Sequence, residues 1–124
     1  MTIPLETLAE QGALSALDVA FARTMARLAD ESRPPVLLAA ALASRAVGLG
    51  HVCLDLARLV AVGSVVDDSG APVGLEMPPG ALEWAALLRS SRLVAPALAA
   101  APARPLVLDD GNRLYLRRYW LHQE

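Results

Sequence analysis

The chain contains no lysine, because all eleven of its basic residues are arginine. A P-loop needs the lysine of GxxxxGKS/T to reach the nucleotide phosphates, and Schiff-base chemistry needs a lysine amine. The missing residue type excludes both from this chain. Its carboxylates show no spacing typical of a metal site either. We therefore expect no ATPase activity, no nuclease activity and no catalytic residue here.

Cysteine and long apolar runs are also scarce. The single cysteine, Cys53, excludes an internal disulfide and suits a reducing compartment. The longest largely apolar run, PPVLLAAALAS at residues 34–44, is shorter than the roughly 20 residues that span a bilayer. The first residues, MTIPLETLAEQG, lack the basic and apolar regions of a signal peptide. We therefore expect a soluble, cytoplasmic protein.

The composition nonetheless supplies a core. Hydrophobic residues make up 55% of the 124 positions and charged residues 19%, and abundant alanine favours helices. This length is typical of one domain, so we expect residues 1–124 to form a single domain. The net charge of −2 is unlike the strongly basic character of an autonomous nucleic-acid-binding domain.

The first half of the sequence predicts helices. Residues 3–11 predict a short one, and SALDVAFARTMARLAD begins with Ser15 and Asp18 at the spacing of a capping box. PPVLLAAALASRAVG is apolar nearly all round and starts with two prolines, so it predicts a central helix. The expected buried stripe of the second helix has four apolar residues at helical spacing: Leu17, Phe21, Met25 and Leu28.

The second half predicts short strands and further helices. HVCL predicts a strand, Asp55 a cap for the helix LARLVAV, and residues 63–80, rich in Gly, Pro and Asp, a loop. ALEWAALLRSS predicts a helix, RLVA a strand, and PLVLDDGNRLYLRRYW a β-hairpin. We therefore expect a mainly helical α+β fold: a helical bundle followed by short strands and a C-terminal β-hairpin, winged-helix-like in character.

GLGHVCLDLARL, residues 48–59, contains residue types that bind metals or act as nucleophiles. In a strand, His51 and Cys53 would face the same side. A zinc site needs about four ligands, and a Cys-His pair needs a third group to orient the base; the spacing shows neither. We interpret Cys53 as a packing residue and His51 as a turn residue, and we expect no metal ligand and no cofactor-binding residue in the chain.

The terminal hairpin and the second helix supply the candidate contact residues. Strand alternation puts Arg113, Tyr115, Arg117 and Tyr119 on one face. Such a face can bind a protein partner, stack on nucleic-acid bases, or pack on a neighbouring domain. Asp18 marks an expected exposed edge of the second helix. The candidate partner interface therefore comprises Asp18, Arg113, Tyr115, Arg117 and Tyr119.

Three stretches resemble one family when they are taken together: ALDVAFAR (16–23), GHVCLDLARL (50–59) and RLYLRRYW (113–120). Their order and spacing are similar to the N-terminal region of RecD, the alpha subunit of bacterial exodeoxyribonuclease V, the RecBCD helicase-nuclease. Asp55 stands where the family pattern GHVCLPL has proline, and both residues suit a strand-to-helix turn. In the third stretch the resemblance depends on four residues: Arg113, Tyr115, Arg118 and Trp120.

The resemblance implies a non-catalytic docking domain. In this family a DNA helicase motor with a P-loop lies C-terminal to the region, so ATP and magnesium belong to the motor and not to these residues. The N-terminal region contacts RecC, with RecB in the same complex, and the assembled enzyme unwinds and degrades double-stranded DNA ends in recombinational repair. Direct DNA binding by this domain is not expected.

Two other functions are compatible with parts of the sequence. A small winged-helix DNA-binding regulatory module fits the terminal hairpin, but it predicts a basic recognition helix, and no expected helix is strongly basic. A small cysteine hydrolase around Cys53 requires a base and an orienting residue, and the sequence offers no convincing candidate for either.

Overall fold

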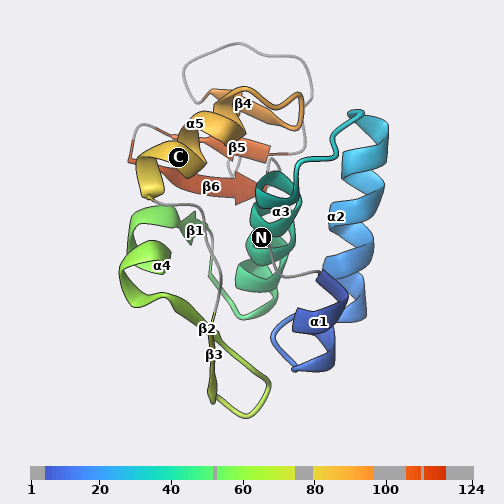
Figure 1. The fold of residues 1–124 in the computed structure, drawn as a ribbon, viewed down its shortest axis with the longest axis vertical. Helices are drawn as coiled ribbons and strands as arrows, with labels where there is room; N and C mark the ends of the chain where they lie inside the picture. Colours follow the sequence, from blue (N-terminus) through green and yellow to red (C-terminus); the bar gives the residue numbers. More distant parts are fainter. Residues whose placement is uncertain (1–4, 52, 75–79, 97–105, 110, 117–124) are drawn as a thin grey trace.

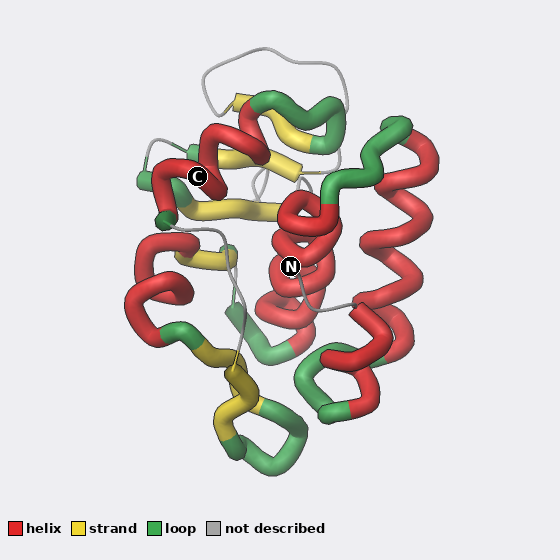
Figure 2. The backbone as a smooth tube through the Cα atoms, viewed as in Figure 1, coloured by secondary structure: helices red, strands yellow, loops and turns green. Residues whose placement is uncertain are grey.

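Five stretches of the chain are described in the computed structural model: residues 5–51, 53–74, 80–96, 106–109 and 111–116. Within them, helices predominate over short strands, and a β-hairpin comes last (Figure 2). The fold is thus α+β and mainly helical, which confirms the expected class. No helix in these stretches combines the length and the apolar character needed to cross a membrane.

Three helices form the first half: α1 (Leu5–Glu10), α2 (Ala16–Leu28) and α3 (Pro34–Gly48). α3 lies beside α2 and also contacts the sheet (Figure 1). The predicted capping box is present at the start of α2. The Ser15 hydroxyl accepts a hydrogen bond from the Asp18 amide at 3.1 Å, and the Asp18 carboxylate accepts one from the Ser15 amide at 2.9 Å.

α3 is the central helix, as its composition predicts. Proline occupies its first turn, where a missing amide hydrogen costs nothing. The helix ends at Gly48, and the amides of Leu49, Gly50 and His51 bond back to carbonyls of the last turn. The buried side chains of α3 are mostly alanine: Val36, Leu38, Ala39, Ala40, Ala41, Leu42, Ala43 and Ala46.

The buried face of α2 differs from the predicted stripe. Leu17 and Leu28 are 76% and 78% exposed, and the other two members of the stripe are half-buried. The buried residues of α2 are instead Asp18, Ala22 and Ala26. Small side chains on both α2 and α3 allow the two backbones to approach closely, and larger side chains are then left toward solvent. The predicted stripe is therefore wrong at its two leucines.

Four strands form one sheet: β1 (Leu54–Asp55), β4 (Val94–Pro96), β5 (Leu106–Leu108) and β6 (Arg113–Leu116). Their order is β1-β6-β5-β4, with β6 antiparallel to both β1 and β5, and β4 parallel to β5. The strand predicted in RLVA is present but begins only at Val94, and the terminal hairpin is confirmed within the described residues. The strand predicted at HVCL is shorter than expected, because β1 begins only at Leu54.

Two further helices are short: α4 (Leu56–Val62) and α5 (Ala81–Arg89). Both are predicted from the sequence, and Asp55 caps α4 as expected, because its carboxylate accepts a hydrogen bond from the Arg58 amide at 3.2 Å. Trp84 on α5 is fully buried, and its indole nitrogen donates to the Pro35 carbonyl at 2.9 Å. This contact joins α5 to the first turn of α3.

The prediction of a loop over residues 63–80 is wrong in its first part. Ser64–Val66 (β2) and Pro72–Gly74 (β3) pair as a two-stranded antiparallel hairpin that projects from the body next to α4 (Figure 1). The Asp67 carboxylate closes the turn by accepting hydrogen bonds from the amides of Ser69 and Ala71 at 2.8 and 2.9 Å. Residues 75–79 lie outside the described part.

Glu31 and Arg33 connect the α2–α3 loop to the end of α5. The Arg33 guanidinium donates to the Glu31 carboxylate at 2.9 and 3.0 Å and to the Ser90 hydroxyl at 2.7 Å. The Glu31 side chain is only 6% exposed. The hydrogen bond from Arg33 is the main cause that lowers the pKa of Glu31 from 4.5 to about 2.

We expect Glu31→Gln to lower the free energy of unfolding at neutral pH by about 1–2 kcal/mol. This loss is smaller than the full pKa shift of Glu31 implies, because the Arg33 side chain is 41% exposed and solvent screens the pair. A carboxyl group with a lowered folded-state pKa stabilises the fold above its unfolded pKa. That contribution is lost as pH falls through the folded pKa. The advantage of the wild-type chain over the variant should therefore decline between about pH 4.5 and pH 2. Urea unfolding of both proteins across this range measures it.

The Glu6–Arg23 pair supplies the control, because both side chains are about half exposed. Glu6→Gln should leave unfolding and its pH dependence nearly unchanged. An identical pH dependence for the wild-type chain and Glu31→Gln would contradict the prediction.

Candidate interaction surface

The terminal hairpin brings Arg113 and Tyr115 to the same carboxylate. Arg113 Nε lies 3.1 Å from Asp109 Oδ2, and the Tyr115 hydroxyl lies 3.5 Å from the same oxygen. Arg113 is exposed, but Tyr115 is only 2% exposed. Tyr115 is therefore covered by its own chain, unlike Arg113, although strand alternation predicts one face for both. Arg117 and Tyr119 lie outside the described residues, so their part in an interface stays a prediction, as does that of Arg113.

His51 and Cys53 do not form a strand pair, because β1 includes neither of them. His51 is exposed and Cys53 is half-buried, and both line a hollow of about 480 Å³ together with Asp55 and Arg58. Burial raises the pKa of the Cys53 thiol, which makes it a weaker nucleophile. Within the described stretches, no group of three or more His, Cys, Asp and Glu side chains is placed to hold a metal ion.

Asp18 is not on an exposed edge of α2. Its side chain is buried, with the residue 5% exposed. One carboxylate oxygen accepts from the Ser15 amide at 2.9 Å, and the other accepts from the Ser44 hydroxyl on α3 at 2.7 Å. The carboxylate of a capping box must turn back toward the helix start, and here that direction also faces α3. Asp18 therefore ties α2 to α3 and supports the surface beside it.

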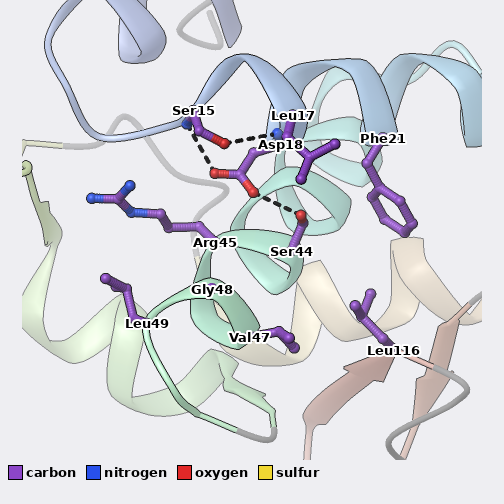
Figure 3. A pocket seen from close by; sticks show the side chains of 10 residues that line it. All are labelled: Ser15, Leu17, Asp18, Phe21, Ser44, Arg45, Val47, Gly48, Leu49 and Leu116. Carbon is purple, nitrogen blue, oxygen red and sulfur yellow. Dashed lines mark hydrogen bonds between the residues drawn. The ribbon is translucent and has the colours of Figure 1, made fainter.

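A groove of about 660 Å³ opens next to Asp18, between the start of α2, the end of α3 and β6 (Figure 3). We call it the α2–α3 groove. Its polar and small lining residues are Ser15, Asp18, Ser44, Arg45 and Gly48. Its large apolar lining residues come from all three elements: Leu17, Phe21, Val47, Leu49 and Leu116.

This groove is not predictable from the sequence, for two reasons. The spacing of Leu17 and Phe21 predicts burial, whereas both side chains line an open surface. The groove also joins positions far apart in the chain, because Val47 and Leu116 face the same hollow. One signal in the sequence could have indicated that Leu17 stays exposed. Ala22 and Ala26 give α2 a second, flatter face that can pack against another helix.

Fold and surface together define a small, mainly helical α+β domain that carries an open apolar groove. Residues 10–115 match the family described as the N-terminal domain of the RecBCD enzyme subunit RecD. The chain belongs to this family, which confirms the resemblance carried by the three sequence stretches.

Two curated relatives show the extent of the match. The chain is similar to the RecBCD enzyme subunit RecD of Mycobacterium tuberculosis (strain H37Rv), with 37% identity over 116 residues that cover 93% of this chain and 18% of the relative. It is similar to the RecBCD enzyme subunit RecD of Mycolicibacterium smegmatis, with 40% identity over 120 residues that cover 97% of this chain and 19% of the relative. The chain thus spans about a fifth of the length of these relatives.

Proposed function

We propose that this chain is a non-catalytic assembly domain of a RecD-type subunit of exodeoxyribonuclease V. In this proposal the domain binds a RecC-type subunit, with a RecB-type subunit in the same complex. The parent subunit is an ATP-dependent 5′→3′ DNA helicase, whose motor holds the ATP and magnesium. The assembled enzyme works in the cytoplasm, where it unwinds and degrades double-stranded DNA ends in recombinational repair.

The observation that supports this proposal most is the α2–α3 groove. Its large lining side chains, apart from Arg45, are apolar, and Leu17 at its rim is 76% exposed. Contiguous apolar surface on a small soluble domain usually marks a contact with another protein. Membership of the RecD family supplies the class of partner, because a subunit must bind other subunits of its enzyme.

Four of the eight arginines in the described stretches have a carboxylate partner within the chain, which favours a protein partner over DNA. Arg23, Arg33, Arg45 and Arg113 each form an ion pair with a carboxylate of the same chain. Phosphate binding depends on clustered cations that release counterions, and a carboxylate partner reduces the positive charge that each of these four side chains presents to a phosphate. With a net charge of −2 as well, the domain is proposed to meet DNA only through the assembled complex.

Reconstitution tests the proposal. The tagged chain is mixed with a purified RecC-type subunit from the same organism, and the mixture is separated by size-exclusion chromatography. We expect the two to co-elute, and the chain alone to show no ATPase or nuclease activity. Failure to co-elute, combined with duplex binding that weakens steeply with salt, would favour the winged-helix DNA-binding alternative.

A further inference from the structure

The α2–α3 groove is open enough to receive side chains from a partner. Leu17 and Phe21 on α2 lie across the hollow from Val47 and Leu116 (Figure 3). Leu17 is 76% exposed, and Leu49 at the end of α3 is 50% exposed. Covering such side chains with apolar groups is favourable in proportion to the area removed from water.

Several backbone amides at the described rims of the groove are already hydrogen-bonded. Ser15 and Asp18 bond each other's amides at the start of α2. The amides of Leu49, Gly50 and His51 bond to carbonyls at the end of α3. β6 is an inner strand between β1 and β5. Leu116 is the only described residue of β6 at the groove, so an extended peptide has little strand edge to join there, whereas an amphipathic helix can dock through side chains alone.

Charge at the groove favours an acidic residue on the incoming helix. Two charged residues line it, Asp18 and Arg45, and both oxygens of Asp18 already accept hydrogen bonds. Arg45 donates through Nη2 to Asp68 at 3.1 Å and to the Gly12 carbonyl at 3.4 Å, while the Asp68 side chain is 80% exposed. Arg45 Nε is buried and makes no hydrogen bond within the described part of the chain. The Arg45 side chain is 13% exposed and its Nε is closed to solvent, so Nε itself cannot meet a partner. Nη1 makes no hydrogen bond within the described part of the chain, and through it the guanidinium retains capacity for a second carboxylate.

We infer that the α2–α3 groove binds an amphipathic helix of the RecC-type subunit, with a carboxylate of that helix beside Arg45. The inference rests on the proposed function and adds the place and the chemistry of the contact. Large aliphatic side chains of the helix pack on Leu17, Phe21 and Leu116, and its acidic residue lies at the Arg45 end.

Two matched leucines on α2 test the groove. Leu17 lines it and Leu28 does not, yet the two are 76% and 78% exposed. Calorimetry measures the Kd of the chain for the purified RecC-type subunit, and circular dichroism shows that each variant is folded. We expect Leu17→Gln to raise the Kd at least about tenfold, and Leu28→Gln to change it by less than about twofold.

A second pair of variants tests the charge. Arg45→Gln and Asp68→Asn remove the same ion pair within the chain, but only Arg45→Gln removes the cation. We expect Arg45→Gln to raise the Kd by about three- to tenfold and Asp68→Asn to leave it within about twofold. Equal effects of the two variants would overturn the placement of a partner carboxylate at Arg45.

The outcomes separate the inference from the proposed function. Equal Kd values for Leu17→Gln and Leu28→Gln overturn the groove as the docking site, while wild-type binding keeps the proposed function. Absence of binding by the wild-type chain overturns the proposed function itself, and the inference falls with it. A second copy is the competing occupant, since α5 exposes Leu82 beside Glu83. If the wild-type chain self-associates and Leu17→Gln abolishes this, the groove binds a second copy of the chain and not a RecC-type subunit.

Discussion

Replacing Trp84 with alanine should lower the free energy of unfolding by about 3–5 kcal/mol, a large part of the stability of a domain this size. Trp84 is fully buried, and its indole nitrogen donates to the Pro35 carbonyl at 2.9 Å. The substitution opens a cavity between α5 and α3 and also removes the indole hydrogen bond to that carbonyl. Urea unfolding followed by circular dichroism measures the loss.

Two further variants divide this effect into its causes. Trp84→Phe keeps most of the volume but loses the hydrogen bond, so we expect a smaller cost of about 1–2 kcal/mol. Leu82→Ala on the same helix changes a side chain that is 77% exposed, and it should cost less than about 0.5 kcal/mol. If Trp84→Ala were no more destabilising than Leu82→Ala, the packing of α5 on α3 described above would be wrong.

Asp18→Ala should lower the free energy of unfolding by about 2–3 kcal/mol, which is less than Trp84→Ala but more than Glu31→Gln. The Asp18 carboxylate accepts from the Ser15 amide at 2.9 Å and from the Ser44 hydroxyl at 2.7 Å. Alanine leaves both donors without this acceptor in a site that is largely removed from water. Chemical unfolding of the purified chain gives the magnitude.

A double-mutant cycle identifies which contact matters. Ser15→Ala removes the hydroxyl that accepts from the Asp18 amide, so we expect it to cost about 1 kcal/mol. Ser44→Ala should cost little when Asp18 is already alanine, because the two residues share one hydrogen bond. Additive effects of Asp18→Ala and Ser44→Ala would show that the link from α2 to α3 contributes little.

Features that depend on neighbouring residues were predictable from the sequence. Ser15 with Asp18, and Asp55 alone, mark helix starts because a side-chain cap needs only a few residues of chain. The terminal hairpin is recognised in the same way, since its strands flank a short polar turn. There the Asp109 carboxylate accepts hydrogen bonds from the amides of Gly111 and Arg113, both at 2.9 Å.

Features that depend on which surfaces meet were not predictable. Hydrophobicity alone assigns Leu17 to the core, but the close approach of α2 to α3 selects Ala22 and Ala26 instead. Tyr115 follows the alternation of a strand, yet alternation gives only the side of the sheet and not whether that side is covered. The α2–α3 groove combines both difficulties, because Leu116 reaches it only through the folded sheet.

The pairing of β1 with β6 determines when the domain can fold during translation. Leu54 pairs with Leu114, and β6 lies between β1 and β5 in the sheet. The helices α1–α4 leave the ribosome before β6 has been synthesised, so the side of α3 that contacts β6 stays uncovered until then. A nascent chain that stops before Leu114 lacks an inner strand and exposes apolar surface to chaperones and proteases. Interrupted synthesis should therefore yield products that the cell degrades, rather than a partly folded domain that persists.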